Sequence, residues 1–230
     1  TILSAWSIYW LELGIFSDID WIPDSISIGL SVLFLVWVIN AYNFIDGIDG
    51  LAISGATFIS GGLILIMIIT NNPSELTIIY FSLLACALAF MIFNWPPARI
   101  FMGDSGSIFL GYIIGTLVLL TIERGDVTEW TWLVIFGYFF ADTTVTQLMR
   151  LLLVKKWYKA HRSHAYQNLA RISGSHLKVT SGIIIYHFVW LLPLMIFSIK
   201  LPDFSMFAAA LAVFPAMLFA VKYGPLASSS

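Results

Sequence analysis

The chain is built from long stretches that carry almost no charge, and these stretches limit what it can fold into. Only 10% of its 230 residues are charged and 60% are hydrophobic, whereas a typical soluble domain is about one quarter charged. Each stretch is close to the roughly 20 residues that an α-helix needs to cross a bilayer. Seven such stretches lie at about 25–42, 50–70, 76–93, 105–122, 130–149, 179–199 and 204–221.

An eighth apolar stretch, residues 1–16, is interrupted only by Glu12 and resembles a span that has lost its beginning. Because the chain starts with Thr1 and not with Met, we expect that its true start is missing. No internal repeat or linker divides the series. The sequence therefore predicts an all-α, multi-pass integral membrane helical bundle of about eight transmembrane helices, in which residues 1–230 form a single domain.

Basic residues gather on the loops that one side of the membrane would carry. If the spans alternate, the loops at 43–49, 94–104 and 150–178 share a face with the C-terminus, and this face holds nine of the eleven basic residues. The other face has only Arg124 and Lys200. By the positive-inside rule, the first face is cytoplasmic. The net charge of −2 gives no indication of a nucleic-acid partner.

The stretch NAYNFIDGIDG, residues 40–50, places two acids where a membrane helix should end. Asp49 could simply cap the helix that follows it. However, Asp46 and Asp49 are three residues apart, as are Asn43 and Asp46, and this spacing puts all three oxygen-bearing side chains on one face of a helix. A cap needs only one acid, so the row favours a functional site.

Asp142 lies deeper, within the predicted span 130–149. An acid at the centre of a membrane helix costs roughly 2.5–3.5 kcal/mol on insertion scales, so such residues usually face a cavity or a partner. Pairing with Arg150, two helical turns further on, is the structural alternative to a functional role. By contrast, His187 in its apolar span fits a packed or hydrogen-bonded core histidine.

The second loop of the cytoplasmic face reads NWPPARIFMGDSGSIFLG. Gly103 and Gly106 flank Asp104 and let the backbone approach a ligand closely, while Ser105 and Ser107 stand at a helix start whose free N–H groups favour an anion. Asp104 could also be only a helix cap. A carboxylate beside an anion-binding helix start suits Mg²⁺, which binds through one or two carboxylates plus substrate phosphates.

The third loop reads KKWYKAHRSHAYQNLAR. Its cations could merely bind anionic lipid headgroups. However, His161 and His164 are also three residues apart, with Arg162 between them, and such donors beside Lys and Arg can hold phosphate oxygens.

Taken in order, NAYNFIDGIDGLA, FMGDSGSIFLG and HRSH resemble three cytoplasmic motifs of the polyprenyl-phosphate N-acetylhexosamine-1-phosphate transferases, the MraY/WecA superfamily of glycosyltransferase family 4. The resemblance covers essentially the whole chain. The HRSHAYQ form is closer to the O-antigen-type branch than to the peptidoglycan branch, whose loop carries three consecutive histidines. The family has an Asp-Asp motif on an earlier cytoplasmic loop, with further spans before it. This motif is not found here, so the resemblance implies that the motif and the N-terminal spans lie upstream of Thr1.

The resemblance implies a function and its partners. The enzyme would transfer a sugar 1-phosphate from a UDP-N-acetylhexosamine-type donor to undecaprenyl phosphate and release UMP, in O-antigen or related cell-envelope polysaccharide synthesis. It would lie in the bacterial inner membrane, among membrane lipids, with its active site on the cytoplasmic face. Mg²⁺ is the implied cofactor, with Mn²⁺ as an alternative ion, and a homodimer is one of the oligomeric states left open. The sugar is also left open.

Site roles follow from the same resemblance. Asp104 matches the metal ligand, and Asp46 and Asp49 match the acidic pair around the metal and the pyrophosphate. Asn43 and Phe101 match nucleoside-contacting positions, with Phe101 placed to stack on uracil. The substrate phosphate would be contacted by the third motif, that is by His161, Arg162 and His164.

Two other classes of protein remain as alternatives. A secondary transporter or ion pathway would use intramembrane acids, but it favours charges near the middle of the bilayer. A CDP-alcohol phosphotransferase would also need Mg²⁺, but its motif has an Ala-Arg pair after Asp-Gly, and here Asp49-Gly50 leads to Leu51-Ala52.

Overall fold

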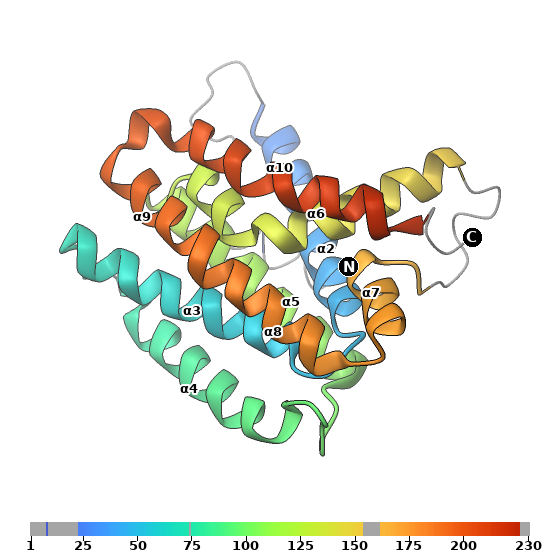
Figure 1. The fold of residues 1–230 in the computed structure, drawn as a ribbon. Helices are drawn as coiled ribbons and strands as arrows, with labels where there is room; N and C mark the ends of the chain where they lie inside the picture. The colour runs from blue at the N-terminus through green and yellow to red at the C-terminus, as the bar shows by residue number, and fades with distance from the viewer. Residues whose placement is uncertain (1–7, 9–22, 74, 154–161, 226–230) are drawn as a thin grey trace. The chain divides into compact units, whose positions relative to one another are not determined.

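The protein is helical in the part that the structure describes. The computed structural model describes residue 8 and residues 23–73, 75–153 and 162–225 (Figure 1). Within these residues, six helices are long and apolar enough to cross a membrane. They span Ser25–Ile45, Leu51–Thr70, Thr77–Asn94, Gly103–Glu123, His176–Lys200 and Pro202–Tyr223. The predicted all-α, multi-pass fold class is therefore confirmed, while the predicted count of eight spans is not.

The first of two compact units holds α2 (Asp24–Ile45) and α5 (Gly103–Glu123). Leu35 and Leu119 form its small buried core together with Ile8. Two glycines of α5 allow the close approach to α2. A Cβ at Gly111 would lie only 2.9 Å from the Ile39 Cα, and one at Gly115 would lie 2.5 Å from a Leu35 methyl group.

The second unit contains the remaining helices and both ends of the third motif loop. Its elements are α3 (Leu51–Thr70), α4 (Thr77–Asn94), α6 (Glu129–Leu153), α7 (Ala165–Ser173), α8 (His176–Tyr186), the π-helix η1 (His187–Leu191), α9 (Leu192–Lys200), the 3-10 helix η2 (Pro202–Phe204) and α10 (Ser205–Tyr223). Within this unit α3 packs against α4, and α8, η1 and α9 form one continuous helical run with α10 alongside (Figure 1). That the two units form a single domain stays a prediction.

An aromatic cluster joins α3, α6 and η1 in the second unit. Gly55 leaves room for the ring of Phe139, because a Cβ at this position would overlap that ring. The His187 ring stacks on Phe58 at 4.7 Å between centroids and meets Phe139 edge-on at 5.3 Å. His187 is 1% exposed, which confirms that it is a core histidine.

Three parts of the chain differ from expectation or lie outside the description. The predicted loop at 150–178 contains a nine-residue helix, α7, whose first turn is hydrogen-bonded to Asp142 of α6. The predicted span 130–149 is helical, as α6, but is not one of the six apolar helices; Asp142 and several threonines lower its hydropathy. The predicted span 1–16 lies outside the described residues apart from Ile8.

Candidate functional site

The first motif forms the turn between α2 and α3. α2 ends at Ile45 and α3 begins at Leu51, with Gly50 as the preceding residue at φ 77°. A left-handed backbone of this kind favours glycine. Since Gly50 occupies the cap position and α3 has no side-chain cap, the alternative that Asp49 caps this helix is wrong.

Asp49 instead joins three segments of the second unit. Its Oδ2 accepts a hydrogen bond from the Ala98 N–H at 3.0 Å, and its Oδ1 lies 3.2 Å from His176 Nδ1. Its backbone carbonyl accepts a 2.7 Å hydrogen bond from the Thr180 hydroxyl. Asp49 therefore fixes the first motif against the second motif loop and the start of α8.

Asn94, the last residue of α4, reinforces this junction. Its Oδ1 accepts a hydrogen bond from the Gly50 N–H at 3.0 Å, while its Nδ2 donates to the Ile100 carbonyl at 2.9 Å. The Asn94 side chain is buried, so both ends of its amide are satisfied where water is scarce. Phe101 follows this segment, and 73% of its surface is exposed.

The third motif lies at the start of α7, and its parts differ in exposure. Arg162 is exposed, whereas the side chain of His164 is buried and immediately precedes the helix. The Gln167 side chain accepts a hydrogen bond from the His164 N–H at 3.3 Å. Arg171 donates a 2.5 Å hydrogen bond to the Arg162 carbonyl. The remaining motif histidine, His161, lies outside the described residues.

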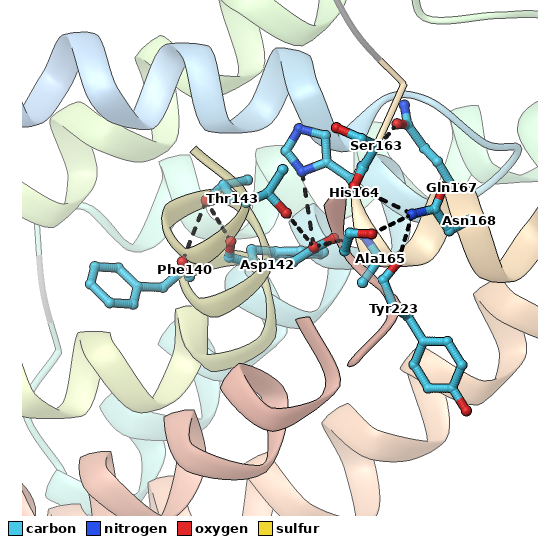
Figure 2. A network of polar contacts seen from close by, with 12 residues as sticks. Phe140, Asp142, Thr143, Ser163, His164, Ala165, Gln167, Asn168 and Tyr223 are labelled. Atoms are coloured by element: carbon cyan, nitrogen blue, oxygen red, sulfur yellow. Dashed lines mark hydrogen bonds and ion pairs between the residues drawn. The ribbon is translucent and has the colours of Figure 1, made fainter. Parts of the chain in front are cut away.

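Asp142 of α6 is buried against the third motif (Figure 2). Its Oδ1 accepts hydrogen bonds from the Ala165 N–H at 3.0 Å and from the Thr146 hydroxyl at 3.3 Å. The same oxygen lies 3.9 Å from Nδ1 of His164. Arg150 is not among these partners, so the structural alternative that Asp142 pairs with Arg150 is wrong.

Asn168 holds α7 from its other side. Its Nδ2 donates to the carbonyls of Tyr223 at 2.6 Å and Gly224 at 2.9 Å, at the end of α10 (Figure 2). α7 thus has one buried polar contact with α6 and another with α10.

The first and third motifs meet at Gly47. A Cβ on Gly47 would overlap the Tyr166 hydroxyl and would lie 2.6 Å from Gln167 Nε2. Burial raises the pKa of Tyr166 well above its ordinary value, and the negative charges of Asp142 and Asp46 raise it further. The phenol next to the first motif therefore stays protonated at neutral pH.

Asn43 and Asp104 belong to the first unit, where Ser107 links their segments. The Ser107 hydroxyl donates to Asn43 Oδ1 at 2.9 Å and also contacts the backbone carbonyls of Gly103 and Asp104. Because α5 begins at Gly103, Asp104 lies within its first turn and is exposed. The cap position is taken by Met102, so the alternative that Asp104 caps this helix is also wrong.

An apolar groove of about 390 Å³ lies beside α7 in the second unit. Residues of α6, α7, α8 and α10 line it, among them Tyr138, Leu169, Ile183 and Phe219. None of its lining residues belongs to the three motifs. The groove is therefore a feature separate from the candidate catalytic residues.

Sequence reasoning missed several partners of the motif residues. His176 is 127 residues from Asp49, and Asn94 is 44 residues from Gly50, so no local spacing indicates either pair. Asn168 follows HRSH closely, but no feature of the sequence indicates that it contacts another helix. Asp142 could be found from the sequence, because it is an isolated acid within an apolar span.

Comparison with known proteins gives consistent matches. Residues 1–122 match the family model described as glycosyl transferase family 4. A probable undecaprenyl-phosphate N-acetylglucosaminyl 1-phosphate transferase of Bacillus subtilis (strain 168) is 35% identical over 150 residues, which cover 64% of this chain and 41% of that protein.

Two phospho-N-acetylmuramoyl-pentapeptide-transferases are similar to this chain at comparable levels. The protein of Buchnera aphidicola subsp. Acyrthosiphon pisum (strain Tuc7) is 32% identical over 140 residues, covering 55% of this chain and 38% of the relative. The protein of Kosmotoga olearia is 37% identical over 127 residues, which cover 55% of this chain and 36% of that relative. The matched region thus spans about two fifths of the length of these curated relatives.

Proposed function

Because the chain belongs to glycosyl transferase family 4, we propose that it carries a catalytic region of a membrane glycosyl-1-phosphate transferase. The reaction moves a sugar 1-phosphate from a UDP-N-acetylhexosamine-type donor to undecaprenyl phosphate and releases UMP. The observation that carries the proposal is the family match, in a chain of apolar helices whose motif residues lie at or next to helix ends. The transporter and CDP-alcohol alternatives are not favoured by these relatives.

Asp104 is the residue that we propose as the metal ligand. Within the described residues no group of three or more His, Cys, Asp or Glu forms a metal cage. Mg²⁺ does not require such a cage, because it binds through one or two carboxylates, several waters and the substrate phosphates. An exposed carboxylate in the first turn of α5 fits this mode, with Mn²⁺ as the alternative ion. When bound, the ion would neutralise phosphate charge.

The remaining roles concern positioning, which is most of what phosphoryl transfer asks of a protein. Asn43 and the exposed ring of Phe101 would contact the nucleoside. Asp46 would act beside the pyrophosphate, and Asp49 would join it while holding the motif loops together through Ala98 and His176.

The third motif would contact the substrate phosphate. His161, Arg162 and His164 supply donors for phosphate oxygens, and the exposed guanidinium of Arg162 can reach a ligand without desolvation. The Arg-Ser pair between the histidines supports the O-antigen-type branch for this chain.

The location of the site follows from the charge distribution. We place the motif loops on the cytoplasmic face of the bacterial inner membrane, because nine of the eleven basic residues lie on that side of the spans. A soluble nucleotide sugar and a lipid phosphate can meet only at such a boundary. This location explains why acids end otherwise apolar helices.

UMP release tests the proposal. The full-length protein, purified in detergent, is incubated with undecaprenyl phosphate, Mg²⁺ and a panel of UDP-sugars. We expect UMP release only when the lipid phosphate, one preferred UDP-N-acetylhexosamine and the divalent ion are all present. Addition of EDTA should abolish this release. UMP release that continues without the lipid acceptor, or that ignores EDTA, would contradict the proposed reaction.

A further inference from the structure

The start of α7 is held partly by its own sequence and partly by another helix. His164 occupies the cap position in an extended conformation, and its N–H donates to the Gln167 side chain at 3.3 Å. The first N–H groups of a helix need acceptors from elsewhere. In this protein the acceptor comes from another helix, because the Ala165 N–H donates to Asp142 Oδ1 across 23 residues of sequence (Figure 2).

Asp142 is well suited to this task. It is fully buried, and the Thr146 hydroxyl on its own helix donates to the same oxygen. A carboxylate at a helix N-terminus is stabilised by the helix dipole as well as by hydrogen bonds. These two donors satisfy Oδ1, whereas Oδ2 is buried with no hydrogen-bond partner among the described residues. Removing the carboxylate would take an acceptor away from the first turn of α7.

Two side chains at the start of α7, those of His164 and Tyr166, connect Asp142 to the motifs. His164 Nδ1 lies 3.9 Å from the carboxylate, and the ring of His164 stacks on that of Tyr166 at 5.8 Å. The Tyr166 hydroxyl in turn fills the space that Gly47 leaves open. A chain of contacts thus runs from Asp142 through the start of α7 to the first motif.

We propose that Asp142 is a positioning residue of the proposed transferase, which acts through His164 by fixing the start of α7 against the Asp46–Asp49 turn. It does not itself contact substrate. The expected effect on turnover rests on the proposed function. The stabilisation of the start of α7 by Asp142 does not depend on any activity.

Coupling between Asp142 and His164 is the decisive measurement. UMP release is compared for the wild type, Asp142→Asn, His164→Ala and the double variant. Asp142→Asn keeps the shape but removes the charge, and we expect kcat to fall by about tenfold. Because Asp142 acts through His164, the double variant should be no slower than His164→Ala. Losses that multiply in the double variant, or an unchanged kcat in Asp142→Asn, would overturn the proposal.

A second measurement tests the hold without catalysis. Amide hydrogen exchange at residues 165–168 should speed up in Asp142→Ala. Thr131→Val serves as the matched control, because Thr131 also lies on α6 and loses a buried 3.0 Å contact with Ser198. This control should leave exchange in α7 and the coupling to His164 unchanged. If amide exchange in Asp142→Ala stayed as in the wild type, the idea that Asp142 stabilises the start of α7 would be refuted, even if activity fell. If the wild type released no UMP, only the proposed function would be refuted.

Discussion

At the scale of single residues, the aspartates predicted as one set differ in what surrounds them. Asp104 is exposed in the first turn of α5, whereas the carboxylate of Asp49 is engaged by Ala98 and His176. The sequence could predict that both lie at helix ends. It could not separate their environments, because the partners of Asp49 are 49 and 127 residues away.

The exposed carboxylate of Asp104 leads to the first prediction. Asp104→Asn keeps the size of the side chain but removes the charge that would bind the metal. We expect UMP release to fall by about a hundredfold or more, the scale of losing one charge-stabilising group in an active site. The thermal unfolding temperature should not change, because Asp104 is exposed and caps no helix.

Asp203→Asn is the matched control for Asp104→Asn. Asp203 is also an exposed acid in the first turn of a helix, but it lies outside the motifs. Its substitution should leave UMP release unchanged. Equal losses in both variants would mean that general surface charge, and not a metal ligand, explains the effect.

Gly47 gives the second prediction. Gly47→Ala would push a methyl group into the Tyr166 hydroxyl and against Gln167. Overpacking of this kind costs about 1–3 kcal/mol, so we expect a lower unfolding temperature together with reduced UMP release. In Gly61→Ala, where the added Cβ meets nothing within 4 Å, both quantities should stay near the wild-type values. A fully stable and active Gly47→Ala protein would show that the first and third motifs do not pack as described.

At the scale of elements, apolar length predicted most of the helices. The stretch 105–122 corresponds to α5 (Gly103–Glu123), and 76–93 corresponds to α4 (Thr77–Asn94). α7 was not predicted, because a nine-residue helix is not stable by itself and leaves little periodicity to detect. In the folded protein, Asp142 bonds to its first turn and Asn168 bonds to the end of α10, through contacts that span 23 to 56 residues.

Asn168 allows a test at this scale. Asn168→Ala removes donors to the Tyr223 and Gly224 carbonyls and leaves these acceptors unpaired. An unsatisfied buried group costs about 1–3 kcal/mol, so we expect a lower unfolding temperature and faster amide exchange in α7. Asn40→Ala is the control, because Asn40 is exposed and donates a hydrogen bond to the Val36 carbonyl of its own helix. Should both variants unfold at the same temperature, the contact with α10 would not stabilise α7.

At the scale of the whole molecule, the fold class follows from the length of the apolar stretches. In lipid the backbone polar groups must bond within the protein, and uncharged stretches of about 20 residues meet this need as helices. The topology, by contrast, rests on the distribution of Lys and Arg. The continuous run from His176 to Lys200 offers a direct test, because its two ends should lie on opposite sides of the membrane.

Labelling of single cysteines can measure this topology. In a Cys86→Ser background, Lys178→Cys should react with a membrane-impermeant maleimide only from the cytoplasmic side, and Lys200→Cys only from the opposite side. Both lysines are exposed, so the label can reach either position. The reverse pattern would invert the orientation of the chain and would place the three motifs away from a cytoplasmic nucleotide sugar.

The contact between Asn168 and the end of α10 also has a consequence for the order of synthesis. The ribosome makes the three motifs before it makes residues 223 and 224, which accept the hydrogen bonds of Asn168. A nascent chain that has just inserted α9 therefore contains the residues of all three motifs but lacks the hydrogen bonds that Asn168 makes to the end of α10. We infer that the third motif becomes fixed only when the last described helix has entered the membrane, so that its assembly is a late, post-insertion event.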